Sequence, residues 1–251
     1  KRFGRVPYVD LDVVEAPLVG GARGVEFSGL VTVASMLYRP ALSEGPMGML
    51  AGLLGGAGHD ARVKELTDSM LEFVTAHEVA HQWWPGLVGS DSRQHPFQDE
   101  ALAQWSAVLH IKERYGPERA KLEADRQVLA NYHTMRLLGS DDGAVDRPVD
   151  AFSGELAYAG LVYGKGPFFY RELQKALGDA VFFERMRAYV ARHRFKHAPP
   201  RGLVDELAKG EHEAVPPAAL GTLACVATRS VWSNSLLFGL AGALVGAGTV
   251  G

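Results

Sequence analysis

Residues 77–84 of the chain read His-Glu-Val-Ala-His-Gln-Trp-Trp, and this stretch decides the expected fold. His77 and His81 are four positions apart, so on an α-helix they project from the same face, because 3.6 residues make one turn. Two ring nitrogens placed in this way can converge on one metal ion at about 2.0–2.1 Å, the distance typical of zinc. Glu78 lies one step along, where its carboxylate can hold a metal-bound water and take its proton. The stretch therefore predicts a metal-binding helix that carries its own general base.

The metal site needs a third protein ligand from elsewhere in the chain, because two imidazoles leave a tetrahedral zinc ion incomplete. Glu100 is the candidate, since it follows His81 after 18 intervening residues and opens the next expected helix. A carboxylate in the first turn of a helix also suits the helix dipole, which is the purely structural interpretation of Glu100. The structural alternative for the two histidines is a helix whose imidazoles are merely packed or solvated. Taken together, the ligands predict one zinc ion per chain in a zinc-peptidase site, with Glu78 as the base.

The composition is that of an ordinary globular protein and argues against one class of partner. The chain has 251 residues, 47% of them hydrophobic and 22% charged, which is enough to build a sizeable core. Its net charge is −3 and no basic block stands out, so we expect no nucleic-acid partner. The single cysteine, Cys225, permits no internal disulfide and does not decide the redox compartment.

The two ends of the chain leave its localisation open between cytoplasmic and membrane-associated. The sequence begins at Lys1 without a signal-peptide pattern, and we expect it to be a piece of something longer. Residues 230–251 carry no charge and approach the length needed to cross a bilayer, although a buried or disordered tail is the alternative. We therefore expect one domain at residues 1–210 and an apolar C-terminal tail of unassigned role at residues 211–251.

The N-terminal region predicts two strands. Residues 5–18 alternate polar and apolar around Val9, Leu11 and Val13, which is typical of a half-buried strand. After a glycine-rich turn, residues 25–33 predict the second strand. Glu26 lies at the start of this second strand, and its spacing alone favours an exposed charge on an edge strand.

The rest of the chain predicts mainly helices. Their expected bounds are 61–84, 96–115, 117–138, 167–177, 180–193 and 201–208. Residues 40–61 are rich in Pro, Gly and Leu and predict an irregular excursion or a short buried helix. Gln104, one turn after Glu100, is either a partner of a metal ligand or solvated surface. Tyr163 precedes Gly-Lys-Gly at a helix entrance, where its phenol either faces a reaction centre or anchors aromatic packing.

Three pieces of sequence, in this order, carry a resemblance to a known family. They are Gly24-Val25-Glu26-Phe27, His77-Glu78-x-x-His81 with Glu100, and Tyr163-Gly164-Lys165-Gly166. Over roughly residues 3–209 the chain resembles the catalytic domain of the M1 family of zinc aminopeptidases, whose relatives include aminopeptidase N and leukotriene A4 hydrolase. Two pieces depart from the family pattern. Val25 and Phe27 stand where the family has Met and Asn, and Asp99-Glu100-Ala101 replaces Asn-Glu-Gly.

The resemblance implies a fold and a metal centre. The fold would be α+β and mostly helical, a thermolysin-like zincin domain with a small N-terminal mixed β-sheet. His77, His81 and Glu100 would bind the zinc ion, and Glu78 would act as the general base. The zinc cleft would lie between the sheet and the helical body.

The resemblance also implies an activity. Glu26, with Gly24 and Val25, would bind the free amino terminus of a peptide substrate, and Tyr163 would donate a hydrogen bond to the oxyanion. We therefore expect an M1-type aminopeptidase that removes N-terminal residues by attack of a zinc-activated water. The alternatives are an endopeptidase or epoxide hydrolase on the same zinc site, or a catalytically idle scaffold that keeps the fold for partner binding. The oligomeric state, and membrane association through flanking or C-terminal segments, stay open.

Overall fold

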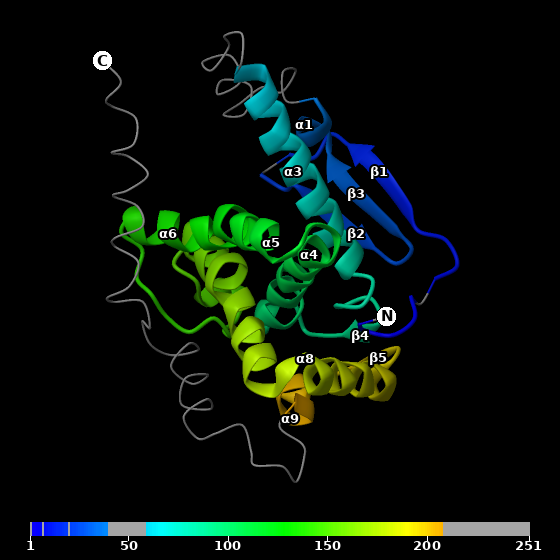
Figure 1. The fold of residues 1–251 in the computed structure, drawn as a ribbon. Helices are drawn as coiled ribbons and strands as arrows, with labels where there is room; N and C mark the ends of the chain where they lie inside the picture. Colours follow the sequence, from blue (N-terminus) through cyan, green and yellow to red (C-terminus); the bar gives the residue numbers. More distant parts are fainter. Residues whose placement is uncertain (1, 7, 20, 40–58, 208–251) are drawn as a thin grey trace.

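The computed structural model describes residues 2–6, 8–19, 21–39 and 59–207. Within these ranges a small sheet and the short helix α1 (Ser35–Tyr38) lie along one side of the long helix α3 (His59–Ala80), and helices α4 to α9 gather on its other side (Figure 1). Of the excursion expected at 40–61, residues 59–61 belong to α3, and residues 40–58 lie outside the described residues. The expected boundary at residue 210 and the apolar tail also lie outside them. No helix in the described part of the chain combines the length and the apolar character needed to span a membrane.

The N-terminal sheet is mixed, as expected, and has three strands. They are β1 (Asp12–Ala16), β2 (Gly24–Phe27) and β3 (Leu30–Ala34), in the order β1-β3-β2. β1 pairs with β3 in parallel and β2 pairs with β3 antiparallel, so β3 is central and β2 is an edge strand. Val31 and Val33 of the central strand are fully buried, which anchors the sheet against α3 and places β2 beside the histidine stretch.

Two expectations for this sheet were wrong. Residues 25–33 form a hairpin rather than one strand, because the chain reverses at Ser28-Gly29, where Gly29 adopts a φ of 77° that favours glycine. The expected strand at 5–18 shrinks to β1, and Val9 is 98% exposed. Val13 and Val14 of β1 are also exposed, so the apolar alternation there does not mark a buried face.

Helix α3 ends four residues earlier than expected. Its last helical residue is Ala80, and the chain continues through turns to Leu87. Pro85 accounts for the early end, since a proline disfavours helical geometry in the residue before it and cannot donate a backbone hydrogen bond. His81 therefore lies one residue past the helix, although its backbone nitrogen still donates to the His77 carbonyl (3.3 Å).

The helical body follows the expected bounds closely. Its elements are η2 (Pro96–Gln98), α4 (Glu100–Tyr115), α5 (Pro117–Glu123), η3 (Ala124–Leu129), α6 (Ala130–Leu137), η4 (Val149–Ala151), α7 (Glu155–Tyr158), η5 (Ala159–Lys165), α8 (Gly166–His193) and α9 (Gly202–Leu207). Segments η3 and η5 have π-helical geometry. The expected pair of helices at 167–177 and 180–193 is α8, which kinks at Gly178 (φ 74°).

Helix α4 is the centre of the hydrophobic core. Its residues 101–109 and 111 are buried, and it contacts α3, α5 and α8. A short parallel pair, β4 (Val88–Gly89) with β5 (Lys196–His197), ties the chain after α3 to the chain after α8. Because α4 is held on all these sides, its first residue, Glu100, is fixed relative to the end of α3.

Candidate metal centre and cleft

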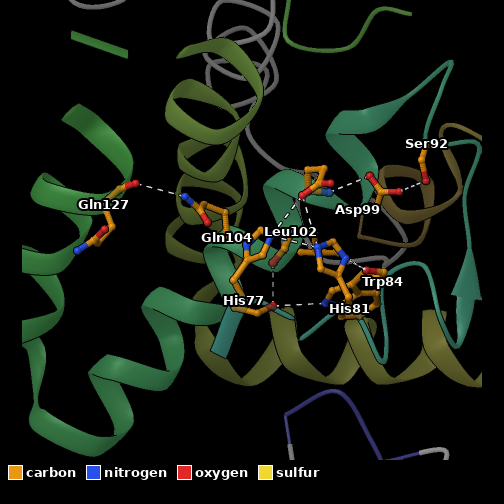
Figure 2. Close-up of polar contacts among 10 residues, drawn as sticks. His77, His81, Trp84, Ser92, Asp99, Leu102, Gln104 and Gln127 are labelled. Carbon is orange, nitrogen blue, oxygen red and sulfur yellow. Dashed lines mark hydrogen bonds and ion pairs between the residues drawn. The ribbon is translucent and has the colours of Figure 1, made fainter. Parts of the chain in front are cut away.

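Three side chains from two elements converge on one point at the start of α4. His77 Nε2 and His81 Nε2 are 3.0 Å apart, and Glu100 Oε2 lies 3.3 Å from the first and 3.4 Å from the second. Figure 2 shows the two rings turned toward each other from the end of α3. The three predicted ligands therefore come together, including Glu100, which the sequence could connect to the histidines only by spacing.

The geometry of these three atoms fits a zinc ion. Ligands bound to tetrahedral zinc at 2.0–2.1 Å lie about 3.3–3.4 Å from one another. The two contacts to Glu100 match this separation, and the contact between the two rings is slightly shorter. Glu100 Oε2 is also buried without a hydrogen bond, which a metal would resolve. Two imidazoles and a carboxylate are a zinc donor set that leaves a fourth position open.

The His81 ring is oriented by the backbone. Its Nδ1 lies 2.5 Å from the Trp84 carbonyl oxygen, and because a carbonyl can only accept, Nδ1 carries the proton. That tautomer leaves the Nε2 lone pair free for a metal. His77 Nδ1, in contrast, is buried without a hydrogen-bond partner among the described residues.

The start of α4 is held by Asp99, which accepts hydrogen bonds from the Glu100 backbone nitrogen (2.8 Å), from Ser90 (3.0 Å) and from Ser92. Asp99 is 2% exposed and immediately precedes Glu100 in the chain. Figure 2 shows Asp99 with Ser92. Asp99 is the N-cap residue of α4, where aspartate is favoured because its carboxylate accepts from the free backbone nitrogens of the first turn.

Burial and mutual interaction shift the pKa values of the ligands in the metal-free protein. Burial lowers the pKa of His77. Burial also acts to lower the pKa of His81, but the interaction with Glu100 outweighs it and raises this pKa to about 9. Burial acts to raise the pKa of Glu100, but its contacts with the two rings hold it well below the usual range. The centre thus keeps a charged carboxylate against a protonated His81 when no metal is bound.

The fourth residue of the centre, Glu78, faces the same cleft and has a raised pKa of about 8, chiefly because of burial. Its carboxylate also touches β2. A Cβ atom at Gly24 would lie only 2.2 Å from Glu78 Oε1, so a side chain there would displace the carboxylate. Gly24 therefore has to be glycine for Glu78 to occupy this position.

A cleft of about 440 Å³ surrounds the centre. It is lined by both histidines, Glu78 and Glu100, and also by Gly24, Glu26, Gln104, Gln127, Asn131, Glu155, Tyr158 and Tyr163, among others. Val25 is not among the lining residues, as the alternation of side chains along a strand would predict for a neighbour of Glu26. Most of the residues singled out from the sequence therefore share one cavity.

Glu26 is partly buried and lines the cleft, so its interpretation as a plain exposed edge charge was wrong. It does lie on an edge strand, but that edge faces α3 rather than solvent. Oxygen atoms of Glu26 and Glu78 and a ring nitrogen of His81 lie within 4.8 Å of one another. The cleft thus holds a second carboxylate group beside the metal ligands.

Gln82, which follows the end of α3, connects this helix to the β2–β3 hairpin. Its Oε1 accepts from the Gly29 backbone nitrogen (2.9 Å), and its Nε2 donates to the Phe27 carbonyl (2.9 Å). The side chain is 1% exposed and spans both ends of the β2–β3 turn. Sequence reasoning missed this role of Gln82, because both partners are more than 50 residues away in the chain.

Gln104 is buried, so its interpretation as solvated surface was wrong. Its Nε2 donates to the Gln127 carbonyl (3.3 Å), and Asn131 donates to the same oxygen (2.9 Å). These three amide side chains line the cleft on the side of η3 and α6 (Figure 2 labels Gln104 and Gln127). They give this wall of the cleft hydrogen-bonding groups rather than apolar ones.

Two tyrosines of the helical body face the metal ligands. The Tyr163 ring centroid is 5.9 Å from that of His77, and the Tyr158 ring lies edge-on to Tyr163 at 5.7 Å. Burial raises the pKa of both phenols, so both keep their protons at neutral pH. The sequence analysis assigned no role to Tyr158. The π-helical geometry of η5, which brings residues five apart together, explains its place beside Tyr163.

Comparison with known proteins agrees with this geometry. A family model described as "Peptidase family M1 domain" matches residues 59–219. Aminopeptidase M1-A of Oryza sativa subsp. japonica is 27% identical over 219 residues, which cover 86% of this chain and 22% of that protein. Aminopeptidase M1 of Arabidopsis thaliana is 27% identical over 154 residues, covering 57% of this chain and 16% of that protein. The chain thus spans about a fifth or less of the length of these relatives.

Solved structures share the fold. Native yeast LTA4 hydrolase superposes with a TM-score of 0.66 at 17% identity, covering 96% of this chain and 35% of that chain. An M1 zinc metallopeptidase from Deinococcus radiodurans superposes with a TM-score of 0.56 at 19% identity, covering 90% of this chain and 41% of that chain. The expected mostly helical zincin fold with a small mixed sheet is confirmed. Since the family model covers well over half of the sequence, the chain belongs to peptidase family M1.

Proposed function

We propose that this chain is the catalytic part of a zinc-dependent aminopeptidase, which removes residues from the free N-termini of peptides. The observation that carries the proposal is the meeting, in one cleft, of a zinc-type donor set with two further carboxylates, Glu78 and Glu26. The relatives named aminopeptidase support the same reaction class.

The metal would be one zinc ion per chain, held by His77, His81 and Glu100. When bound, zinc acidifies a water molecule and polarises a carbonyl group. Glu78 then has a proton-transfer role, because its carboxylate lies in the cleft beside the donor set. It takes the proton of the attacking water and returns it to the leaving amine. A bound dication would lower the pKa of Glu78 from its metal-free value of about 8, which keeps it a base at neutral pH.

Tyr163 supplies the electrophilic assistance. Its phenol keeps its proton and lies next to the His77 ring, so it can donate a hydrogen bond to the carbonyl oxygen of the substrate as charge develops there. Loss of one such donor typically costs about 10²–10³-fold in kcat. We therefore expect Tyr163→Phe to lower kcat by this amount and to leave zinc binding unchanged.

Glu26 sets the position of the amino terminus. A carboxylate beside the metal ligands can form a charge-assisted hydrogen bond with a substrate ammonium group. A peptide held in this way presents its first peptide bond to Glu78 and Tyr163, which is the geometry of an exopeptidase. Removal of the Glu26 charge should weaken binding of free N-termini and spare the hydrolytic chemistry.

The test compares peptides that differ only at the N-terminus. Purified protein is assayed for zinc by elemental analysis and for cleavage of aminoacyl reporters and of the same peptides with an acetylated N-terminus. We expect about one zinc per chain, cleavage of the free peptides and no measurable cleavage of the acetylated ones. Equal rates of cleavage of the free and the acetylated peptides would mean that the protein is an endopeptidase rather than an aminopeptidase. A zinc-loaded but inert protein would favour the idle scaffold. Turnover of an epoxide without peptide cleavage would favour the epoxide hydrolase.

A further inference from the structure

A buried ion pair joins Lys165, two residues after Tyr163, to Asp142. Lys165 Nζ is 2.8 Å from Asp142 Oδ1 and 3.0 Å from the Gly143 carbonyl oxygen. The Lys165 side chain is 1% exposed and that of Asp142 is 10% exposed. Asp142 Oδ1 also accepts from the Gly143 backbone nitrogen (2.8 Å), so the lysine binds a loop whose shape the same carboxylate fixes. The proposed chemistry uses none of these groups.

The ion pair is connected to the cleft through one short segment. Lys165 and Tyr163 both belong to η5 and are two positions apart. Residues two apart on a helix point in nearly opposite directions, so the segment carries the phenol on its cleft side and the ammonium on the side of the loop after α6. A rotation of η5 that moved one side chain would move the other.

The segment η5 packs closely on α6, and its Leu161 and Val162 are buried in the hydrophobic core. A Cβ atom at Gly160 would lie 2.4 Å from the Met135 side chain, and one at Gly164 would lie 2.6 Å from the Tyr132 backbone nitrogen. The glycines thus let η5 lie directly on α6, but they offer no side chain to interlock with it. The Lys165–Asp142 pair adds a directional bond to this packing, which favours a single rotation of η5.

The free energy of a buried ion pair also favours a role of Lys165 and Asp142 in positioning over a role in stability. Removing two charges from water costs about as much as their attraction returns, so a buried ion pair adds little net stability compared with an apolar pair of similar volume. What a buried pair does provide is a fixed geometry, because every other arrangement leaves a charge uncompensated. This argument favours a role in orientation.

We propose that Lys165 and Asp142 form a positioning pair that holds η5 in the rotation at which the Tyr163 phenol faces the metal ligands. The role of Tyr163 in catalysis rests on the proposed function, whereas its orientation does not. The two can therefore be tested apart, one by kinetics and the other by spectroscopy.

The kinetic test is a double-mutant cycle. Lys165→Met and Asp142→Asn are made alone and together with Tyr163→Phe, and kcat is measured on an aminoacyl reporter after zinc content has been confirmed. In the parent background each variant should lower kcat about 10-fold or more, with a small change in KM, because a misplaced catalytic group costs rate rather than binding. In the Tyr163→Phe background the same changes should alter kcat less than about 2-fold, because the positioned group is gone.

The spectroscopic test places 3-fluorotyrosine at position 163 and records its ¹⁹F resonance without substrate. We expect one resonance in the parent and a shifted or broadened one in Lys165→Met and Asp142→Asn. Glu206→Gln is the control, because it weakens the ion pair of another buried carboxylate with the exposed Arg192 (3.2 Å), which joins α8 to α9. The control should leave the resonance and the cycle unaffected, even where it lowers the melting temperature.

The outcomes separate the two proposals. An unchanged resonance in both variants overturns the positioning role, and so do kcat losses that are equal in the two backgrounds. If the parent protein hydrolyses no peptide, the proposed function fails, and the fluorine resonance alone then decides the positioning role. If Lys165→Met does not fold, Asp142→Asn decides it, because this change keeps the volume of the side chain and removes only the charge that pairs with Lys165.

Discussion

Gly24 and Glu78 illustrate how one residue constrains the proposed chemistry of another across the cleft. A Cβ at Gly24 would lie 2.2 Å from Glu78 Oε1, 2.3 Å from its carboxyl carbon and 2.5 Å from Cγ, so the carboxylate would have to move as a whole. Gly24→Ala should therefore lower kcat about 10²-fold or more through displacement of the base, while the three metal ligands stay in place. The measurement is kcat together with zinc content.

Gly21→Ala serves as the control for that prediction. Gly21 is exposed in the same N-terminal segment, and a Cβ there would meet nothing within 4 Å, although its φ of 83° makes any side chain mildly strained. We expect a small loss of stability and nearly unchanged kcat. If Gly24→Ala retained parental activity, the contact with Glu78 would not be what constrains this position.

At the scale of single residues, the sequence predicted that His77, His81 and Glu100 come together, but it predicted their surroundings poorly. His77, Glu78 and His81 lie within one helical turn, so local periodicity was enough to group them. Glu26 and Tyr158 needed contacts between segments far apart in sequence, which spacing does not encode. The resemblance to a family supplied the site role of Glu26, but nothing supplied that of Tyr158 or Gln82.

At the scale of elements, the β2–β3 hairpin has to be held against α3 for Glu26 to reach the metal ligands, and Gln82 makes that connection. Gln82→Leu removes both bonds and leaves the Phe27 carbonyl and the Gly29 nitrogen unsatisfied, at a cost of about 1–3 kcal/mol in unfolding free energy. We expect KM for free peptides to rise several-fold, with less effect on kcat and none on zinc content. Steady-state kinetics on a dipeptide series measures this.

Gln98→Leu is the matched control for the hairpin. Gln98 Nε2 also donates to a backbone carbonyl, that of Pro200 (2.7 Å), but from the exposed surface of η2. Its loss should leave KM unchanged. The hairpin argument would be contradicted if Gln82→Leu changed KM no more than Gln98→Leu does.

The elements that the sequence predicted least well are those whose bounds depend on tertiary contacts. Periodicity located every long helix, because each buries one face over many residues. It missed the hairpin at Ser28-Gly29, because the alternating apolar pattern continues through the turn. It also missed the π-helical geometry of η5, which leaves no mark in the hydrophobic pattern.

At the scale of the whole molecule, the metal centre should make folding stability depend on pH in opposite ways with and without zinc. In the metal-free protein the pKa of His81 is raised to about 9 and that of Glu78 to about 8. A group whose pKa is raised by folding stabilises the protein below its unfolded pKa, and that stabilisation disappears as the pH rises through the folded value. The contribution of the site in the metal-free protein should therefore decline between about pH 6 and pH 9.

Zinc reverses this trend, because it needs an unprotonated His81 and so competes with the proton. The binding of zinc to the native state adds stability by mass action, and this gain grows as the pH approaches 9. The difference in melting temperature between zinc-loaded and chelator-treated protein should thus increase from pH 6 to pH 9 at fixed free zinc. Glu100→Gln is the control, since it removes the charge that raises the His81 pKa as well as a ligand, and it should abolish the difference. A melting-temperature difference that is large but constant across this range would mean that His81 does not hold the proton with which zinc competes.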